Sequence, residues 1–247
     1  MQEAESGQPA SGKTQSGLYS GYHEDIFAAS NVFSKQEYEN SCHFFERNFE
    51  KYLPGDRKAR ILDIGCGAGH FLNYLQKRGY ENIIGIDISP QQIEFCEKKL
   101  TCPLQVADGF DFLASGNHQY EAIAANDLLE HIQKDRVIEL ARLVRESLTP
   151  DGVFLAKTPN LGNIFALYSR YRDFTHEVGF TDKSLRQVLS AAGFRQITVK
   201  GAVSATAKPR GRCIRYCLYF LQRKMYWHNG FAAPEVLDPL LIAASKK

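Results

Sequence analysis

Short apolar runs alternate along most of the chain with segments in which apolar side chains recur every three or four residues. The short runs predict strands at 60–65, 82–88, 103–107, 120–126, 152–158, 195–201 and 239–244. The longer spacing predicts helices at 69–78, 90–99, 135–148 and 182–192, with a short turn near 110–114. Strands that alternate with helices in this way are typical of an α/β fold with a doubly wound, mostly parallel sheet, here of seven strands.

Three segments lie outside the alternation. Residues 1–18 are polar and predict a disordered leader, and residues 19–57 predict an N-terminal helical cap. The helix within this cap begins with a capping box at Ser34–Glu37. Tyr19–Glu24, before that helix, either folds over the ligand as a lid or packs on the outside of the protein. The remaining domain, 58–247, carries insertions at about 160–181 and 202–236, after the fifth and sixth strands. Because open α/β sheets bind ligands at the carboxyl ends of their strands, we expect both insertions to cover a ligand cleft.

Composition and charge exclude several classes. The net charge of +2 gives no reason to expect a nucleic-acid partner, and the sequence carries no nucleic-acid motif. The six cysteines show neither a C-x-x-C pair nor a zinc spacing, so we expect reduced thiols and a cytoplasmic location. The first residues lack the basic region and apolar core of a signal peptide, and no segment approaches the ~20 apolar residues that span a bilayer.

The most informative motif joins the first two predicted strands. Residues Ile61–His70 form a strand that ends in a turn with glycines at 65, 67 and 69, and Asp87 ends the next strand. This order predicts a nucleoside site in which Asp87 binds a ribose. A dinucleotide fingerprint requires a third glycine where this chain has His70, which disfavours a nicotinamide enzyme.

This motif resembles motif I of class I S-adenosylmethionine (SAM)-dependent methyltransferases, and the likeness covers about residues 58–160. It implies a Rossmann-like methyltransferase fold with SAM as the cofactor. Asp63 would accept a hydrogen bond from the methionine amino group, and Asn126 would line the floor beneath the methionine. The remaining implied cofactor residues are Gly65, Cys66 and Gly67 in the turn, Asp87 and Ile88 at the ribose, and Asp108, Gly109 and Phe110 around the adenine.

The first insertion resembles a narrower group, the methyltransferases found with bacterial polysaccharide and lipopolysaccharide assembly. The shared pattern is Thr158–Asn160, then Arg170–Thr181, then Ser184-Leu185. It implies O-methylation of a sugar, or of a phosphate on a sugar, in a surface glycan or its lipid-linked precursor. An alcohol acceptor needs a base, for which His176 and His131 are the candidates.

Alternatives stay open on this acceptor side. Asp173, His176 and Glu177 could only cap their loop, and no His/Asp/Glu grouping in the sequence resembles the cation site of catechol-type methyltransferases, so we expect no metal. A small-molecule O-methyltransferase of quinone or secondary-metabolite biosynthesis would share the core motifs. A SAM-binding scaffold without catalysis is a third hypothesis.

The second insertion is unusually basic. Between Arg195 and Lys224 there are eight Lys and Arg residues and no Asp or Glu. Apolar side chains recur at helical spacing within it, at Ile214, Cys217, Leu218, Leu221 and Met225. The segment either packs these side chains on the core or offers a surface to an anionic acceptor, such as a lipid-linked sugar, with peripheral contact at the inner membrane face.

Overall fold

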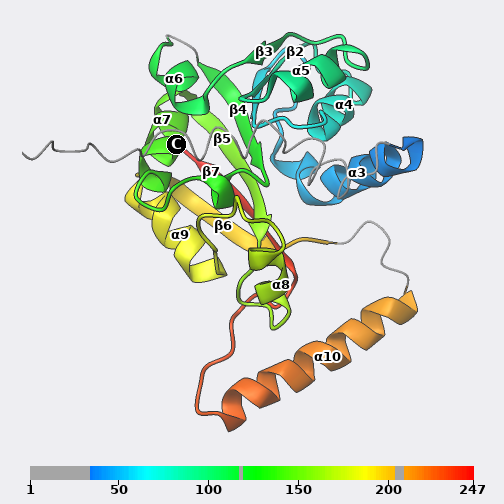
Figure 1. The fold of residues 1–247 in the computed structure, drawn as a ribbon, viewed down its shortest axis with the longest axis vertical. Helices are drawn as coiled ribbons and strands as arrows, with labels where there is room; N and C mark the ends of the chain where they lie inside the picture. Colours follow the sequence, from blue (N-terminus) through cyan, green and yellow to red (C-terminus); the bar gives the residue numbers. More distant parts are fainter. Residues whose placement is uncertain (1–33, 117–118, 204–208) are drawn as a thin grey trace, which may run out of the picture.

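The computed structural model describes residues 34–116, 119–203 and 209–247 (Figure 1). The predicted leader, the possible lid at Tyr19–Glu24 and the start of the helical cap lie outside the described residues. A seven-stranded sheet runs through the molecule in the order β3-β2-β1-β4-β5-β7-β6. Its strands are β1 Arg60–Ile64, β2 Asn82–Asp87, β3 Leu104–Val106, β4 Tyr120–Asn126, β5 Leu148–Pro159, β6 Arg195–Gly201 and β7 Leu240–Lys246.

The sheet is mixed rather than purely parallel. Strands β1 to β5 pair in parallel, whereas β7 pairs antiparallel with both β5 and β6. The second insertion explains this direction. It starts at the carboxyl end of β6 and leads into β7 at the same end of the sheet, so β7 runs antiparallel to β6. The prediction of a mostly parallel sheet therefore needs this correction at one strand.

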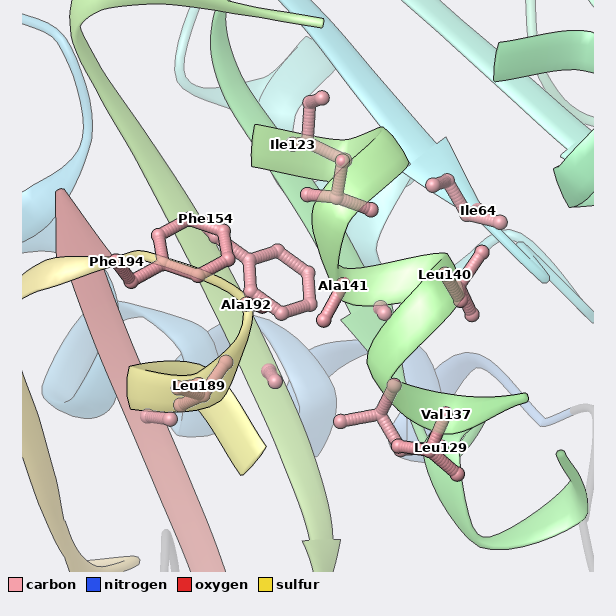
Figure 2. Close-up of a cluster of buried hydrophobic side chains, with 14 of the residues drawn as sticks. Ile64, Ile123, Leu129, Val137, Leu140, Ala141, Phe154, Leu189, Ala192 and Phe194 are labelled. Atoms are coloured by element: carbon pink, nitrogen blue, oxygen red, sulfur yellow. The ribbon is translucent and has the colours of Figure 1, made fainter. Parts of the chain in front are cut away.

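Helices cover both faces of the sheet. Helices α3 Lys35–Asn48, α4 His70–Lys77 and α5 Pro90–Glu97 pack on one face, and α6 Gly109–Ala114, α7 Val137–Glu146 and α9 Asp182–Ala191 pack on the other. Alternate side chains of one strand enter opposite cores, as Ile61 and Leu62 of β1 do. Figure 2 shows the second core, where Ile123 and Phe154 from the sheet meet Leu140 of α7 and Leu189 of α9. Each fully buried side chain of this size contributes about 1.5–3 kcal/mol of transfer free energy.

Element boundaries differ from the prediction mainly at β5. The prediction begins this strand at residue 152, but β5 already begins at Leu148. Tyr120 pairs with Leu148 and Ala122 with Val153, so the intervening residues of β5 form an irregularity inside the strand. A Cβ at Gly152 would lie 2.9 Å from the carbonyl oxygen of Tyr120, which shows why this position suits glycine.

Each insertion contains one helix, α8 Ala166–Tyr171 in the first and α10 Pro209–His228 in the second. In Figure 1, α10 lies apart from the sheet at the end of the molecule that also carries α8. Among the described helices, none is long and apolar enough to cross a membrane.

Candidate active site

A cavity of about 960 Å³ opens at the carboxyl ends of β1, β2 and β4. All ten residues predicted to bind the cofactor line it, and so do both candidate histidines, His131 and His176. Arg172 of the first insertion and Arg215 of the second insertion line it as well. The structure therefore brings the sequence-predicted residues into one space.

The glycine turn forms the wall of the cavity nearest β1. Gly65, Gly67 and Gly69 all have positive φ, at 66°, 50° and 71°. A Cβ would lie 2.9 Å from Leu128 Cδ1 at Gly65 and 2.5 Å from Leu100 Cδ1 at Gly69, so larger residues would be both strained and crowded. The turn thus exposes its backbone to the cavity.

His70 occupies the position of the third fingerprint glycine. It begins α4 and its ring lies 4.5 Å from the ring of Tyr38, whose hydroxyl donates to the Ala68 carbonyl. Burial lowers the pKa of His70 to about 4, so the ring is neutral at pH 7. The side chain serves to join α3 to the turn.

Asp87 is the last residue of β2, and its carboxylate holds the glycine turn by a hydrogen bond. Its Oδ2 accepts a hydrogen bond from the Gly67 N–H and its Oδ1 accepts one from the Ser89 N–H, both at 2.9 Å. Burial raises its pKa, although these two hydrogen bonds oppose the shift. Each carboxylate oxygen keeps a lone pair that a ribose hydroxyl could use.

Asp63 and Asn126 lie close together on the cavity floor, where Asn126 lowers the pKa of Asp63 although no well-formed hydrogen bond joins them. Asp63 is 2% exposed and its Oδ1 has no hydrogen-bond partner, nor does either amide atom of Asn126. Burial chiefly, with the nearby Asp87, raises the pKa of Asp63 to about 8, against the opposing effects of Asn126 and Lys157. Buried polar atoms in native proteins almost always have partners, so these orphaned atoms indicate a polar ligand. The SAM amino group fits them.

Asp108 and Phe110 frame the end of the cavity at β3. Asp108 Oδ1 accepts from the backbone N–H groups of Phe110 and Asp111 and so caps α6. The Arg136 guanidinium lies 3.7 Å from the centre of the Phe110 ring. This end therefore presents one apolar face and one carboxylate, as an adenine site requires.

On the acceptor side, His131 is held by a chain of hydrogen bonds. The Thr175 hydroxyl donates to Asp173 Oδ1 at 2.7 Å, and Thr175 Oγ1 lies 2.9 Å from His131 Nδ1. Because that hydroxyl donates its proton to Asp173, its oxygen is the acceptor for the Nδ1–H of His131. Burial chiefly, with the nearby His176, lowers the pKa of His131 to about 4, against the opposing effect of Asp173, so the imidazole is neutral at pH 7.

Glu130 completes this cluster and was not predicted. Its backbone carbonyl accepts from the N–H groups of Glu177 and Val178, at 2.7 and 3.1 Å, which fixes the first insertion against the end of β4. Its side chain is 3% exposed, and Oε2 has no hydrogen-bond partner among the described residues. The rings of His131 and His176 are 4.8 Å apart between centroids. The only sequence signal was the adjacency of Glu130 and His131, since His176 approaches them through tertiary contacts alone.

The prediction that Asp173 and its neighbours cap their own loop is partly supported. Asp173 Oδ1 accepts from the backbone N–H of Thr175 as well as from its hydroxyl. The same carboxylate also supports His131, from another segment, which the sequence did not suggest. Asp127, between Asn126 and the cluster, has a φ of 52° and pairs with Lys157 at 2.6 Å.

Helix α10 has its polar side turned inward. The less exposed stripe consists of Arg215, Tyr219, Gln222 and Tyr226. Tyr219 donates a hydrogen bond to Asp238 Oδ1 at 2.8 Å, and Arg215 lies 3.8 Å from the same oxygen. The large apolar side chains of α10 face solvent, with exposed fractions from 54% to 74%: Ile214, Leu218, Phe220, Leu221, Met225 and Trp227. The interpretation in which this helix packs its apolar side chains on the core is wrong.

Comparison with known proteins agrees with this arrangement. Residues 33–199 match the family described as "Methyltransferase domain". The cyclopropane-fatty-acyl-phospholipid synthase of Escherichia coli K12 is 28% identical over 102 residues, covering 40% of this chain and 26% of the relative. The ubiquinone biosynthesis O-methyltransferase of Neisseria meningitidis serogroup C is 28% identical over 112 residues, covering 42% of this chain and 45% of the relative. The chain thus spans less than half the length of these curated relatives.

Among solved structures, a SAM-dependent methyltransferase from Archaeoglobus fulgidus superposes with a TM-score of 0.68. The superposition covers 90% of this chain and 98% of the Archaeoglobus chain, and the sequence identity is 24%. This likeness extends the similarity in fold to nine-tenths of the chain.

Proposed function

Because the chain belongs to this family of SAM-dependent methyltransferases, we propose that it methylates a hydroxyl oxygen of an anionic, amphiphilic acceptor. The acceptor class we favour is a sugar or sugar phosphate of a bacterial surface glycan or its lipid-linked precursor. The observation that carries the proposal is the oriented, unprotonated imidazole of His131 beside His176 in the cofactor cavity. An alcohol acceptor needs a base of this kind to take its proton, whereas a more nucleophilic amine or thiolate acceptor does not.

The cofactor half of the cavity has residues suited to each part of SAM. Asp63 and Asn126 would hold the methionine moiety, Asp87 the ribose, and Asp108 with Phe110 the adenine. When bound, SAM would supply an electrophilic methyl group to the acceptor oxygen, leaving S-adenosylhomocysteine and a methyl ether or ester. The hydroxyl proton would pass to the histidine base. The remaining work of the protein is alignment of the acceptor oxygen, which is worth several kcal/mol in well-oriented reactions.

Two arginines support an anionic acceptor. Arg172 and Arg215 come from the first and second insertions, and both line the cavity. Arg215 lies 3.8 Å from Asp238. The guanidinium group matches phosphate and carboxylate oxygens in a bidentate manner.

The exposed apolar surface supports an acceptor at a bilayer. Helix α10 exposes the apolar side chains of Leu218, Leu221 and Trp227 to solvent. It also carries basic residues and no acidic residue. Amphipathic helices of this composition lie in the interface of anionic membranes. Phe165, Tyr168 and Tyr171 of the first insertion are also exposed, at 72–74%. The phospholipid named for the E. coli relative is in keeping with a lipid acceptor.

The direct test is transfer of labelled methyl from SAM into separated acceptor pools. We expect label in the lipid-linked sugar or glycan fraction, recovered as an O-methyl sugar after hydrolysis. Label in the quinone fraction would favour the small-molecule function suggested by the Neisseria relative. No label in any pool, together with tight SAM binding, would favour the scaffold hypothesis.

The role of α10 has its own test. The double variant Leu218→Gln/Trp227→Ser should bind several-fold less to vesicles of anionic phospholipid, because it removes two exposed apolar side chains. Val106→Gln is the matched control, since Val106 is 48% exposed at the β3 edge of the sheet, away from α10. Equal sedimentation of both variants and the unaltered protein with the vesicles would contradict a membrane role for this helix.

A further inference from the structure

We propose that Glu130, His131 and His176 form a binding site for a divalent transition-metal ion at the acceptor end of the cavity. A metal was not expected from the sequence. Binding of the ion stands independently of the acceptor, whereas its use in methyl transfer rests on the proposed function.

The ligand atoms are close to coordinating distance of one another. One carboxylate oxygen of Glu130 and one ring nitrogen from each histidine all lie within 4.8 Å of one another. Metal bonds to these atoms are about 2.0–2.2 Å, so two ligands on one ion lie no more than about 4.4 Å apart. Only a small closure is needed. His176 can supply it, because it is partly exposed in the connection between α8 and α9.

The buried carboxylate of Glu130 is the independent sign of a missing partner. Its Oε2 is inaccessible to solvent and has no hydrogen-bond partner among the described residues. The nearby ammonium group of Lys157 is committed to Asp127 at 2.6 Å. Lys157 and the Thr158 hydroxyl favour the ionised form of Glu130 less than burial opposes it, and a bound cation would supply the compensation that a buried carboxylate needs.

The second layer of the cluster resembles that of known metal sites. A metal-binding histidine usually donates its other ring N–H to an oxygen that is itself held in place. His131 does this through Thr175, whose hydroxyl donates in turn to the buried Asp173. With Nδ1 bound to Thr175 Oγ1, Nε2 is the ring nitrogen of His131 that would bind the ion.

The donor set indicates the class of ion. Two imidazoles and one carboxylate suit Mn²⁺, Fe²⁺, Co²⁺ or Zn²⁺ better than Ca²⁺, which prefers oxygen ligands alone. Three protein ligands leave coordination positions open towards the cavity. An acceptor hydroxyl bound there would have a lower pKa and would release its proton to solvent before receiving the methyl group. In that arrangement both histidines act as ligands rather than as bases.

The test is direct metal binding to the full chain, prepared without a histidine tag and freed of metal with a chelator. Co²⁺ is titrated by its visible absorption, and Mn²⁺ by the loss of the free-ion electron paramagnetic resonance signal. We expect one ion per chain, with affinity at least tenfold weaker in Glu130→Gln and in His176→Ala. His43→Ala is the matched control, since its side chain is 65% exposed on α3, and it should bind as the unaltered protein does. SAM affinity, measured on the same samples, reports that each variant is folded.

The outcomes separate this proposal from the proposed function. The metal site is overturned if the unaltered protein binds no ion, or if binding is the same in Glu130→Gln and His43→Ala. If methyl transfer to a hydroxyl continues after full chelation of the metal, the proposed role of the metal in the reaction is overturned. A histidine would then remain as the candidate base. Tight metal binding without any hydroxyl methylation would sustain the site and reject the proposed acceptor.

Discussion

The two halves of the cavity are built in different ways. The cofactor half consists of the ends of neighbouring strands of the sheet, joined by bonds such as that from the Gly67 N–H to Asp87 Oδ2. The acceptor half depends on an insertion folded back over the sheet, in which His131 and Thr175 are 44 residues apart. The first half is part of the sheet itself, whereas the second is a separate segment attached to it.

This difference has a mechanistic consequence. Strand ends are fixed by the sheet's hydrogen bonds and by the buried core, so the cofactor half is formed before any ligand arrives. The acceptor half is anchored by a few bonds, chiefly those from Glu177 and Val178 to the Glu130 carbonyl. Variants in the first half should therefore change SAM affinity, and variants in the second should change turnover without changing that affinity.

The largest effect on affinity should come from Asp63→Asn. The substitution preserves the shape of the side chain but removes the buried carboxylate to which we assign the SAM amino group. Hydrogen bonds to charged groups contribute about 1.5–3 kcal/mol, so SAM affinity should fall about 10- to 100-fold. Isothermal titration calorimetry measures it, with Asp111→Asn on the exposed side of α6 as the control. An unchanged dissociation constant would remove Asp63 from the cofactor site.

The next effect concerns pH and acts through the same carboxylate. With its pKa raised to about 8 by burial, Asp63 is largely protonated in the free protein at pH 6–7. A cationic amino group binds the ionised form, so binding releases a proton and SAM affinity should weaken as pH falls. The expected change is about tenfold per unit below pH 7. Asp87, Lys157 and Cys66 are the charged or titratable groups around Asp63, and the charges of Asp87 and Lys157 act on it in opposite directions.

Asp63→Asn supplies the control for this pH dependence. In that variant the affinity should be nearly flat from pH 7 to pH 6, because His70 and His131, whose pKa values are about 4, stay neutral there. A slope that persists in the variant would assign the dependence to another group. Above pH 7.5 the α-amino group of SAM itself begins to titrate, so the comparison is confined to the acid side.

The contrast between the halves also explains how far the sequence could lead. All seven strands and the glycine turn were predicted because their signals are local: apolar runs, turn residues and an acid at a strand end. The ten cofactor residues then fall in one cavity, since parallel strands align their carboxyl ends. The direction of β7 and the extension of β5 to Leu148 were not predicted, because strand pairing decides both.

The acceptor side could not be predicted to the same depth. Nothing local distinguishes the buried Glu130 from a surface glutamate, and the bond between Thr175 and His131 joins two separate segments. The failure at α10 has a different cause: its periodicity was identified, but an amphipathic pattern cannot show which face turns inward. There Asp238 and the inward stripe of Arg215, Tyr219 and Gln222 decide the orientation.

The smallest of these effects, and the one that isolates the acceptor half, should come from Thr175→Val. Valine keeps the size and the backbone bond to Asp173 but removes the hydroxyl that holds His131 in one tautomer. A single neutral hydrogen bond is worth about 0.5–1.5 kcal/mol, so kcat should fall about two- to tenfold. SAM affinity should be unchanged, and Thr175→Ser should restore kcat because serine retains the hydroxyl. If the serine variant is as slow as the valine variant, the methyl group of Thr175 packs the loop and the hydroxyl does not position His131. If SAM affinity falls with kcat, the two halves are coupled, and the separation between a rigid cofactor site and an attached acceptor segment no longer holds.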